Sequence, residues 1–153
     1  MIADEIGVTK AAVYHQYNAK EEIVRAVAEA EVDRLEAVLD AAEAEGPAGR
    51  VRDAVISGII ELAVTRRREV SSLLNDPIIG RIYAKNTHLL KVIDRLNRLL
   101  MGPDAGPDSK VATAMLTAAI SGAAIHPLVV EGDDDMLRAQ LDRLARGFLR
   151  LHP

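Results

Sequence analysis

The stretch IADEIGVTKAAVYHQYNAKEEI, residues 2–23, decides the fold that the sequence predicts. Its first residues have helical spacing, and Gly7 suits the end of that helix because glycine tolerates a positive φ. Thr9 is a good N-cap for a second helix, which we expect from Lys10 to about Tyr17. Asn18 then caps a third helix. A helix, a glycine-containing turn and another helix form a helix-turn-helix, whose second helix enters the major groove of DNA.

This stretch resembles the end of the DNA-binding head in tetracycline-repressor-like (TetR family) transcription regulators. Three motifs of that family follow one another here: Gly-Val-Thr at residues 7–9, Tyr-x-x-Tyr at residues 14–17, and Asn-x-Lys-Glu-Glu-Ile at residues 18–23. The likeness covers roughly residues 1–30. Beyond them, the chain matches the family only in the number and length of its expected helices.

The resemblance implies an all-α fold, with a truncated helix-turn-helix head followed by a helical ligand-binding and dimerisation domain. We expect residues 1–22 to form the partial head, residues 23–45 a connecting helix, and residues 46–153 the regulatory domain. It also implies a ligand-responsive repressor that acts as a homodimer. The implied partners are double-stranded DNA with a palindromic operator and a small-molecule effector.

Heads of that family have three helices, and this sequence begins within the second. We therefore expect the first helix, which would cover Ile6, Val13 and Tyr17, to be absent, through either a late start or a true truncation. An in-frame basic, amphipathic helix encoded upstream would favour the regulator, and a stop codon there would favour a protein that has lost DNA binding.

Candidate DNA contacts lie on the expected recognition helix and at the start of the next one: Thr9, Lys10, Ala11, Tyr14, His15 and Lys20. The first three are at the N-terminus of the recognition helix, where side chains reach base edges. The last three suit phosphate contacts, and for Tyr14 the resemblance favours this role over core packing.

Composition favours an all-helical chain, because 49% of the 153 residues are hydrophobic and only 3% are aromatic. The sequence contains no cysteine, which excludes disulfides and thiolate metal sites and suits the cytoplasm. The uncharged stretch of residues 111–130 is interrupted by polar residues and proline, so we expect a buried helix rather than a membrane span. The net charge of −4 argues mildly against DNA binding, although most nearby acidic residues lie on the connecting helix, away from the head.

Hydrophobic periodicity predicts six helices after the recognition helix: residues 20–44, 50–65, 69–75, 77–101, 108–126 and 135–151. In the first of these, Ile23, Val27 and Leu35 are expected to belong to the inward stripe. The run Arg66-Arg67-Arg68 is interpreted as a solvated connector rather than a second phosphate contact.

A small, mostly apolar molecule is expected to bind among the helices at 50–65, 77–101 and 108–126. These helices are apolar with scattered polar residues, which is how small-molecule sites are built. The candidate ligand-binding residues are Ser57, Tyr83, Thr87, His88, Thr117 and His126.

No catalytic motif occurs in the sequence, so an enzyme is the least favoured class and no cofactor is expected. Glu61, His88 and His126 could in principle bind a metal, but isolated histidines on different helices are more often partly buried polar residues, so no metal site is predicted. Helices 108–126 and 135–151 are expected to form the homodimer as a four-helix bundle, since one is rich in small residues and the other in leucine. The alternative is a helical ligand-binding or dimerising protein that has lost DNA binding.

Overall fold

Seven helices make up the part of the chain that the computed structural model describes, residues 10–75, 77–102 and 105–151. They are α2 (Lys10–Glu43), α3 (Ala48–Thr65), α4 (Arg67–Leu74), α5 (Ile79–Lys85), α6 (Thr87–Met101), α7 (Pro107–Ala124) and α8 (Asp134–Leu151). No strand occurs within these ranges, which confirms the predicted all-α class. No helix among the described residues is long and apolar enough to cross a membrane.

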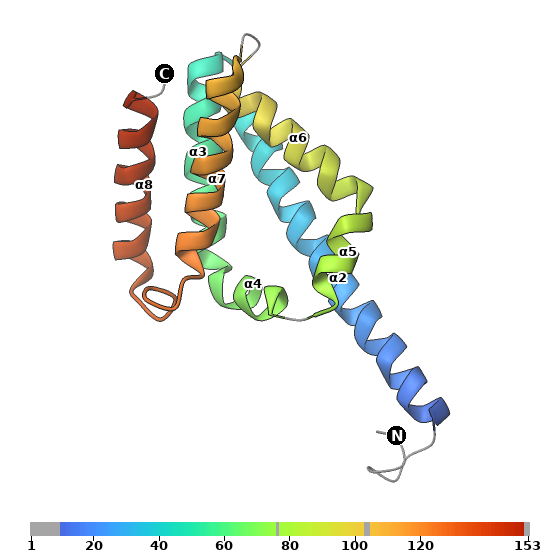
Figure 1. The fold of residues 1–153 in the computed structure, drawn as a ribbon. Helices are drawn as coiled ribbons and strands as arrows, with labels where there is room; N and C mark the ends of the chain where they lie inside the picture. Colours follow the sequence, from blue (N-terminus) through green and yellow to red (C-terminus); the bar gives the residue numbers. More distant parts are fainter. Residues whose placement is uncertain (1–9, 76, 103–104, 152–153) are drawn as a thin grey trace.

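Helix α3 is the centre of the arrangement, since it contacts α2, α6, α7 and α8. Figure 1 shows α3, α7 and α8 running alongside one another, while α2 and α6 incline away from them. The main hydrophobic cluster joins these five helices, with Leu39, Val55, Ile56 and Leu96 among its buried members. The largest fully buried side chains are all β-branched residues or leucine: Leu39, Val55, Ile56, Ile60, Val64, Ile78 and Val92.

A smaller satellite cluster holds α4 and α5 against the first half of α2. It consists of Val24, Ala28, Leu73, Ile78, Ile79 and Ile82, with Tyr83 packed against it. None of these residues belongs to the main cluster. The two short helices therefore depend on α2 for their burial.

Helix α2 is continuous from Lys10 to Glu43, so the predicted break at Asn18 is wrong for the described backbone. No glycine or proline occurs between these ends, and an asparagine inside a helix costs well under about 1 kcal/mol. Local sequence therefore permits a helix to continue through this point.

The buried face of α2 also differs from the prediction in its first half. Val24 and Ala28 are buried, whereas Ile23 is 64% exposed and Val27 is exposed as well. Apolar residues occur at adjacent positions here and lie on both faces of the helix. Periodicity alone therefore did not determine which face is buried. Packing against α4 and α5 selects the face that carries Val24 and Ala28.

The single helix predicted for residues 77–101 is instead two helices, α5 and α6, separated at Asn86. Asn86 has an extended backbone (φ −84°, ψ 94°), and its Oδ1 accepts a hydrogen bond from the Leu89 N–H at 2.9 Å. This is an N-cap interaction, which satisfies one of the free N–H groups at the start of α6. The capping capacity of asparagine outweighs the continuous apolar periodicity.

Arg67 is not solvated, in contrast to the prediction for the arginine run: it is only 2% exposed. Its Nε donates to the Val130 carbonyl at 2.7 Å, and its guanidinium also contacts the Gly132 carbonyl and Asp134. The side chain therefore ties the start of α4 to the segment that joins α7 and α8. A buried guanidinium requires such partners, because an unpaired buried charge is costly.

Candidate functional site

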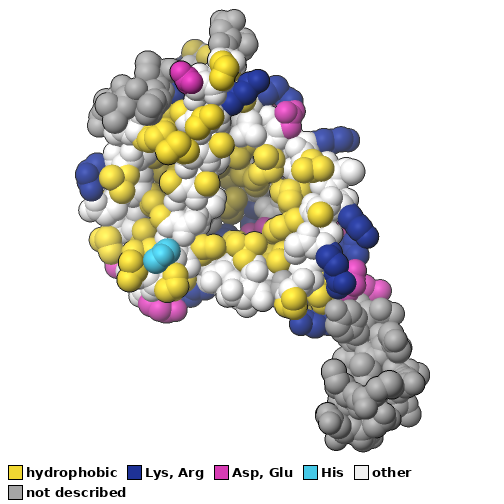
Figure 2. Space-filling view, viewed as in Figure 1, with side chains coloured by type: hydrophobic (Ala, Val, Ile, Leu, Met, Phe, Trp, Pro, Cys, Tyr) yellow, Lys and Arg dark blue, Asp and Glu magenta, His cyan; other side chains and the backbone are white. Residues whose placement is uncertain are grey.

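A mostly apolar cavity of about 450 Å³ lies among α2, α3, α4, α5, α6 and α7. Its aliphatic lining includes residues from each side: Val32, Leu35, Ile59, Leu62, Val70, Leu74, Leu89, Ile93, Leu96 and Ile125. Figure 2 shows a hollow with hydrophobic side chains around it on the face that is in view. A cavity of this size and character is typical of small-molecule sites.

Five polar or ionisable residues interrupt the aliphatic lining: Glu31, Tyr83, Asn97, Thr117 and Ser121. The Thr117 hydroxyl donates to the Thr113 carbonyl at 3.0 Å within α7, so its oxygen retains acceptor capacity. These groups give the cavity a few fixed points at which a bound molecule can be oriented.

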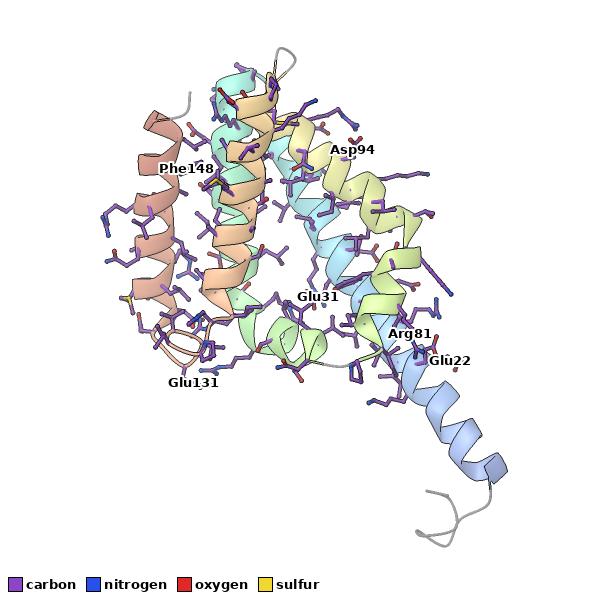
Figure 3. All side chains as sticks on the ribbon, in the orientation of Figure 1. Glu22, Glu31, Arg81, Asp94, Glu131 and Phe148 are labelled. Carbon is purple, nitrogen blue, oxygen red and sulfur yellow. The ribbon has the colours of Figure 1, made fainter. Side chains whose placement is uncertain are left out.

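Glu31 is the acidic residue of this lining, and its side chain is only 9% exposed. Arg66 donates to Glu31 Oε1 from Nη2 at 2.8 Å and from Nε at 3.3 Å, and Arg34 donates to the same oxygen at 2.8 Å. Figure 3 shows Glu31 on the part of α2 that faces the other helices. The hydrogen bond from Arg66 to Glu31 raises the pKa of that guanidinium above its usual range, so the guanidinium stays ionised.

Tyr83 is electrostatically coupled to Glu31. Burial of its phenol, and then the negative charge of Glu31, raise the pKa of Tyr83 above its ordinary value. The phenol therefore stays neutral at physiological pH and retains its proton as a hydrogen-bond donor.

Of the six predicted ligand-binding residues, Tyr83 and Thr117 line this cavity and the other four do not. The Ser57 hydroxyl interacts with Arg146 on α8 at 3.3 Å, and Thr87 is exposed at the start of α6. The ring of His126 accepts a hydrogen bond from the Leu128 N–H at 3.2 Å. Polarity on the right helices was thus too broad a criterion, because it did not distinguish the faces of each helix.

Glu31 was missing from the predicted set, because periodicity did not identify the buried face of this part of α2. It occupies the inward face of α2, three residues after buried Ala28 and one residue before buried Val32. An acidic residue in that position needs a partner or a cavity.

His88 lies instead in a surface contact between α6 and α2. Its Nε2 is 3.0 Å from a Glu36 oxygen, and its Nδ1 is 3.8 Å from an Asp33 oxygen. These three side chains each offer one potential metal-ligand atom within 4.8 Å of the others, but all are substantially exposed. Glu61, by contrast, pairs with Arg138 on α8, so the set of Glu61, His88 and His126 does not form a cluster.

The predicted DNA contacts fall mainly outside the described residues. This holds for Thr9 altogether and for the side chains of Lys10, Ala11, Tyr14 and His15, whose backbone belongs to α2. Lys20 is exposed on α2.

An exposed apolar surface covers parts of α7 and α8, the helices predicted to form the dimer. Val111 and Met115 lie four residues apart on α7, and Leu144 lies on α8; each is more than half exposed. At Gly122, on the same helix as the first two, an added Cβ would meet no atom within 4 Å. These side chains form an apolar surface that is open to solvent on the protomer.

Comparison with known proteins gives a match at the N-terminus. Residues 1–27 match the family model described as bacterial regulatory proteins, tetR family. No curated protein and no solved structure matches the chain.

Proposed function

We propose that the chain is a ligand-responsive repressor of transcription of the tetR family of bacterial regulators, which the match over residues 1–27 supports. It acts in the cytoplasm as a homodimer on a palindromic operator. DNA binding follows from the family; ligand response, repression and dimerisation are proposed from the cavity and the exposed surfaces.

Helix α2 is the observation that carries the proposal, because it belongs to both functional regions. Its first part lies within the segment that matches the family model, and Glu31, Val32 and Leu35 further along line the cavity. Only about 6 Å of helix separates residue 27 from residue 31, at 1.5 Å per residue. A molecule in the cavity therefore contacts the helix that leads directly to the DNA-binding segment.

The proposed mechanism is a two-state equilibrium between a conformation that fits the operator and one that does not. A ligand that binds the second conformation more tightly changes the spacing of the two DNA-binding segments in the dimer, and operator affinity falls. Because this coupling is reciprocal, operator DNA should weaken ligand binding by the same factor.

The test is fluorescence anisotropy with duplexes from the region upstream of the protein's own gene and with scrambled duplexes, at several salt concentrations. Affinity for the specific duplex should exceed that for the scrambled one and fall as salt increases. Lys20→Ala and Tyr14→Phe should weaken binding to all duplexes similarly, whereas Lys10→Ala should change base preference. Lys91→Ala, an exposed lysine on α6, is the matched control and should change neither.

The rival function is a helical ligand-binding or dimerising protein without DNA binding. It would be favoured if no duplex from the upstream region bound more tightly than the scrambled control at any salt concentration. Ligand binding in the cavity would then remain to be explained on its own.

A further inference from the structure

We propose that the cavity binds a molecule with an apolar body and a protonated amine, and that Glu31 holds the amine. This inference rests on the proposed function of the cavity as the effector site. It adds the chemical class of the effector.

The first observation concerns which oxygen of Glu31 is used. All the hydrogen bonds that Glu31 accepts among the described residues, from Arg66 and Arg34, go to Oε1. Glu31 Oε2 is also not among the fully buried side-chain atoms that lack a partner. The side chain is 9% exposed and lines the cavity, so a residue of the cavity wall has a carboxylate oxygen with free acceptor capacity.

The second observation is an aromatic residue in the same lining. Tyr83 lines the cavity together with Glu31, and burial of its phenol, followed by the negative charge of Glu31, raises the pKa of Tyr83. A cation near the ring face is attracted by the ring quadrupole, and a cation near Glu31 is attracted by its charge. The two residues therefore favour the same kind of ligand group, a positively charged hydrogen-bond donor.

The rest of the lining determines the body of the ligand. Most of the remaining wall is aliphatic, with only Asn97, Thr117 and Ser121 as further polar residues. Burial of an alkyl or aryl group against such a wall is favourable at about 25 cal/mol per Å² of apolar surface. A ligand carboxylate is disfavoured near the Glu31 oxygen, because like charges repel.

The position of Glu31 also connects this recognition to regulation. Glu31 lies on α2, and its partner Arg66 lies at the junction of α3 and α4. An amine at the carboxylate competes with Arg66 for the negative charge and weakens the link between α2 and that junction. Ligand charge thereby acts on the helix that leads to the DNA-binding segment.

The experiment compares three probes of one chain length, n-octylamine, n-octanol and octanoate, by isothermal titration calorimetry at pH 7.4 with the full chain. n-Octylamine should bind at least about tenfold more tightly than n-octanol, as a charge-assisted hydrogen bond exceeds a neutral one by about 1.4 kcal/mol or more. In Glu31→Gln, which retains the side-chain shape and an acceptor for Arg66, that preference should fall to about twofold or less while n-octanol affinity stays unchanged.

Glu69→Gln is the matched control. Glu69 also pairs with Arg66, at 3.2 Å, but it does not line the cavity. This variant should retain the full preference for the amine. An equal loss in both variants would mean that the effect passes through Arg66, and it would overturn a direct role for Glu31.

The outcomes separate this inference from the function on which it rests. Binding of all three probes with equal affinity, or a preference for octanoate, would overturn the amine class while leaving an effector cavity in place. If none of the three bound and none raised the melting temperature, the effector cavity itself would be refuted, together with the inference.

Discussion

Three consecutive arginines, Arg66, Arg67 and Arg68, have three different environments. Arg66 pairs with Glu31 at the cavity, Arg67 is almost completely buried, and Arg68 is 65% exposed, with Glu131 at 3.7 Å. A run of identical residues carries no periodicity, so the sequence could not show which member is buried. Arg67 is the buried one because, at the junction of α3 and α4, its side chain points to the segment after α7. That segment supplies the carbonyl groups to which Arg67 donates.

Replacing Arg67 with alanine should destabilise the fold by about 2–3 kcal/mol, because the carbonyls of Val130 and Gly132 lose a charged donor. Urea denaturation followed by circular dichroism measures the change. Arg68→Ala is the control and should change stability by less than about 1 kcal/mol, since its ion pair is exposed. Equal effects of the two substitutions would contradict the buried role of Arg67.

For the cavity too, the sequence predicted some individual lining residues and not others. Helix identity, apolar character and two of the polar lining residues, Tyr83 and Thr117, could be predicted from the sequence. The faces on which Ser57 and His126 lie could not, because both residues are polar and the helices that contain them pack on several sides. Glu31 could not be predicted either, because packing and not periodicity selects the buried face of this part of α2.

Among the helices, α2 and α3 lie close together at Gly58. A Cβ at this position would overlap with Val38 Cγ1, so the absence of a side chain allows the two helices to pack closely. Valine in a helix strongly prefers one rotamer, so Val38 has little freedom to move aside. This glycine was not singled out from the sequence, where a lone glycine inside a helix only lowers helix propensity.

Gly58→Ala should destabilise the protein by up to about 2 kcal/mol, since overpacking costs about 1–3 kcal/mol and the gain in helix propensity offsets about 1 kcal/mol of that cost. Gly49→Ala, also in α3, is the matched control because its added Cβ meets no atom within 4 Å. The control should leave stability unchanged or increase it. A stabilising effect of both substitutions in thermal denaturation would refute the close approach at Gly58.

Helix boundaries followed from the sequence where glycine and proline mark them, as before α3 and α7. Helix boundaries could not be predicted where a single asparagine determines whether a helix ends. Asn86 caps α6 and divides the predicted helix, whereas Asn18 lies within continuous α2. The same residue type suits a cap and is tolerated in a helix, so tertiary packing determines the outcome.

For the whole molecule, the exposed apolar surface on α7 and α8 predicts a homodimer at micromolar concentration. Gly122→Arg should convert it to a monomer by introducing bulk and charge at a position where an added Cβ meets no atom of the protomer within 4 Å. Sedimentation equilibrium tests this, with circular dichroism as a check that the fold is retained. Gly49→Arg, which adds the same side chain in open space on α3, should remain dimeric. A monomeric unmodified chain would contradict the prediction.

The satellite cluster has a consequence for the rate at which the molecule opens. Helices α4 and α5 contain 8 and 7 residues, and helices shorter than about 12 residues are marginal without packing partners. Their amides should therefore exchange with solvent deuterium faster than those of α3, through local opening that leaves the main cluster intact. Val70 and Leu74 on α4 and Tyr83 on α5 form part of the cavity wall, so each such opening also uncovers the cavity. Hydrogen-exchange mass spectrometry should find this exchange slowed by a bound ligand, because a ligand in the cavity contacts both helices.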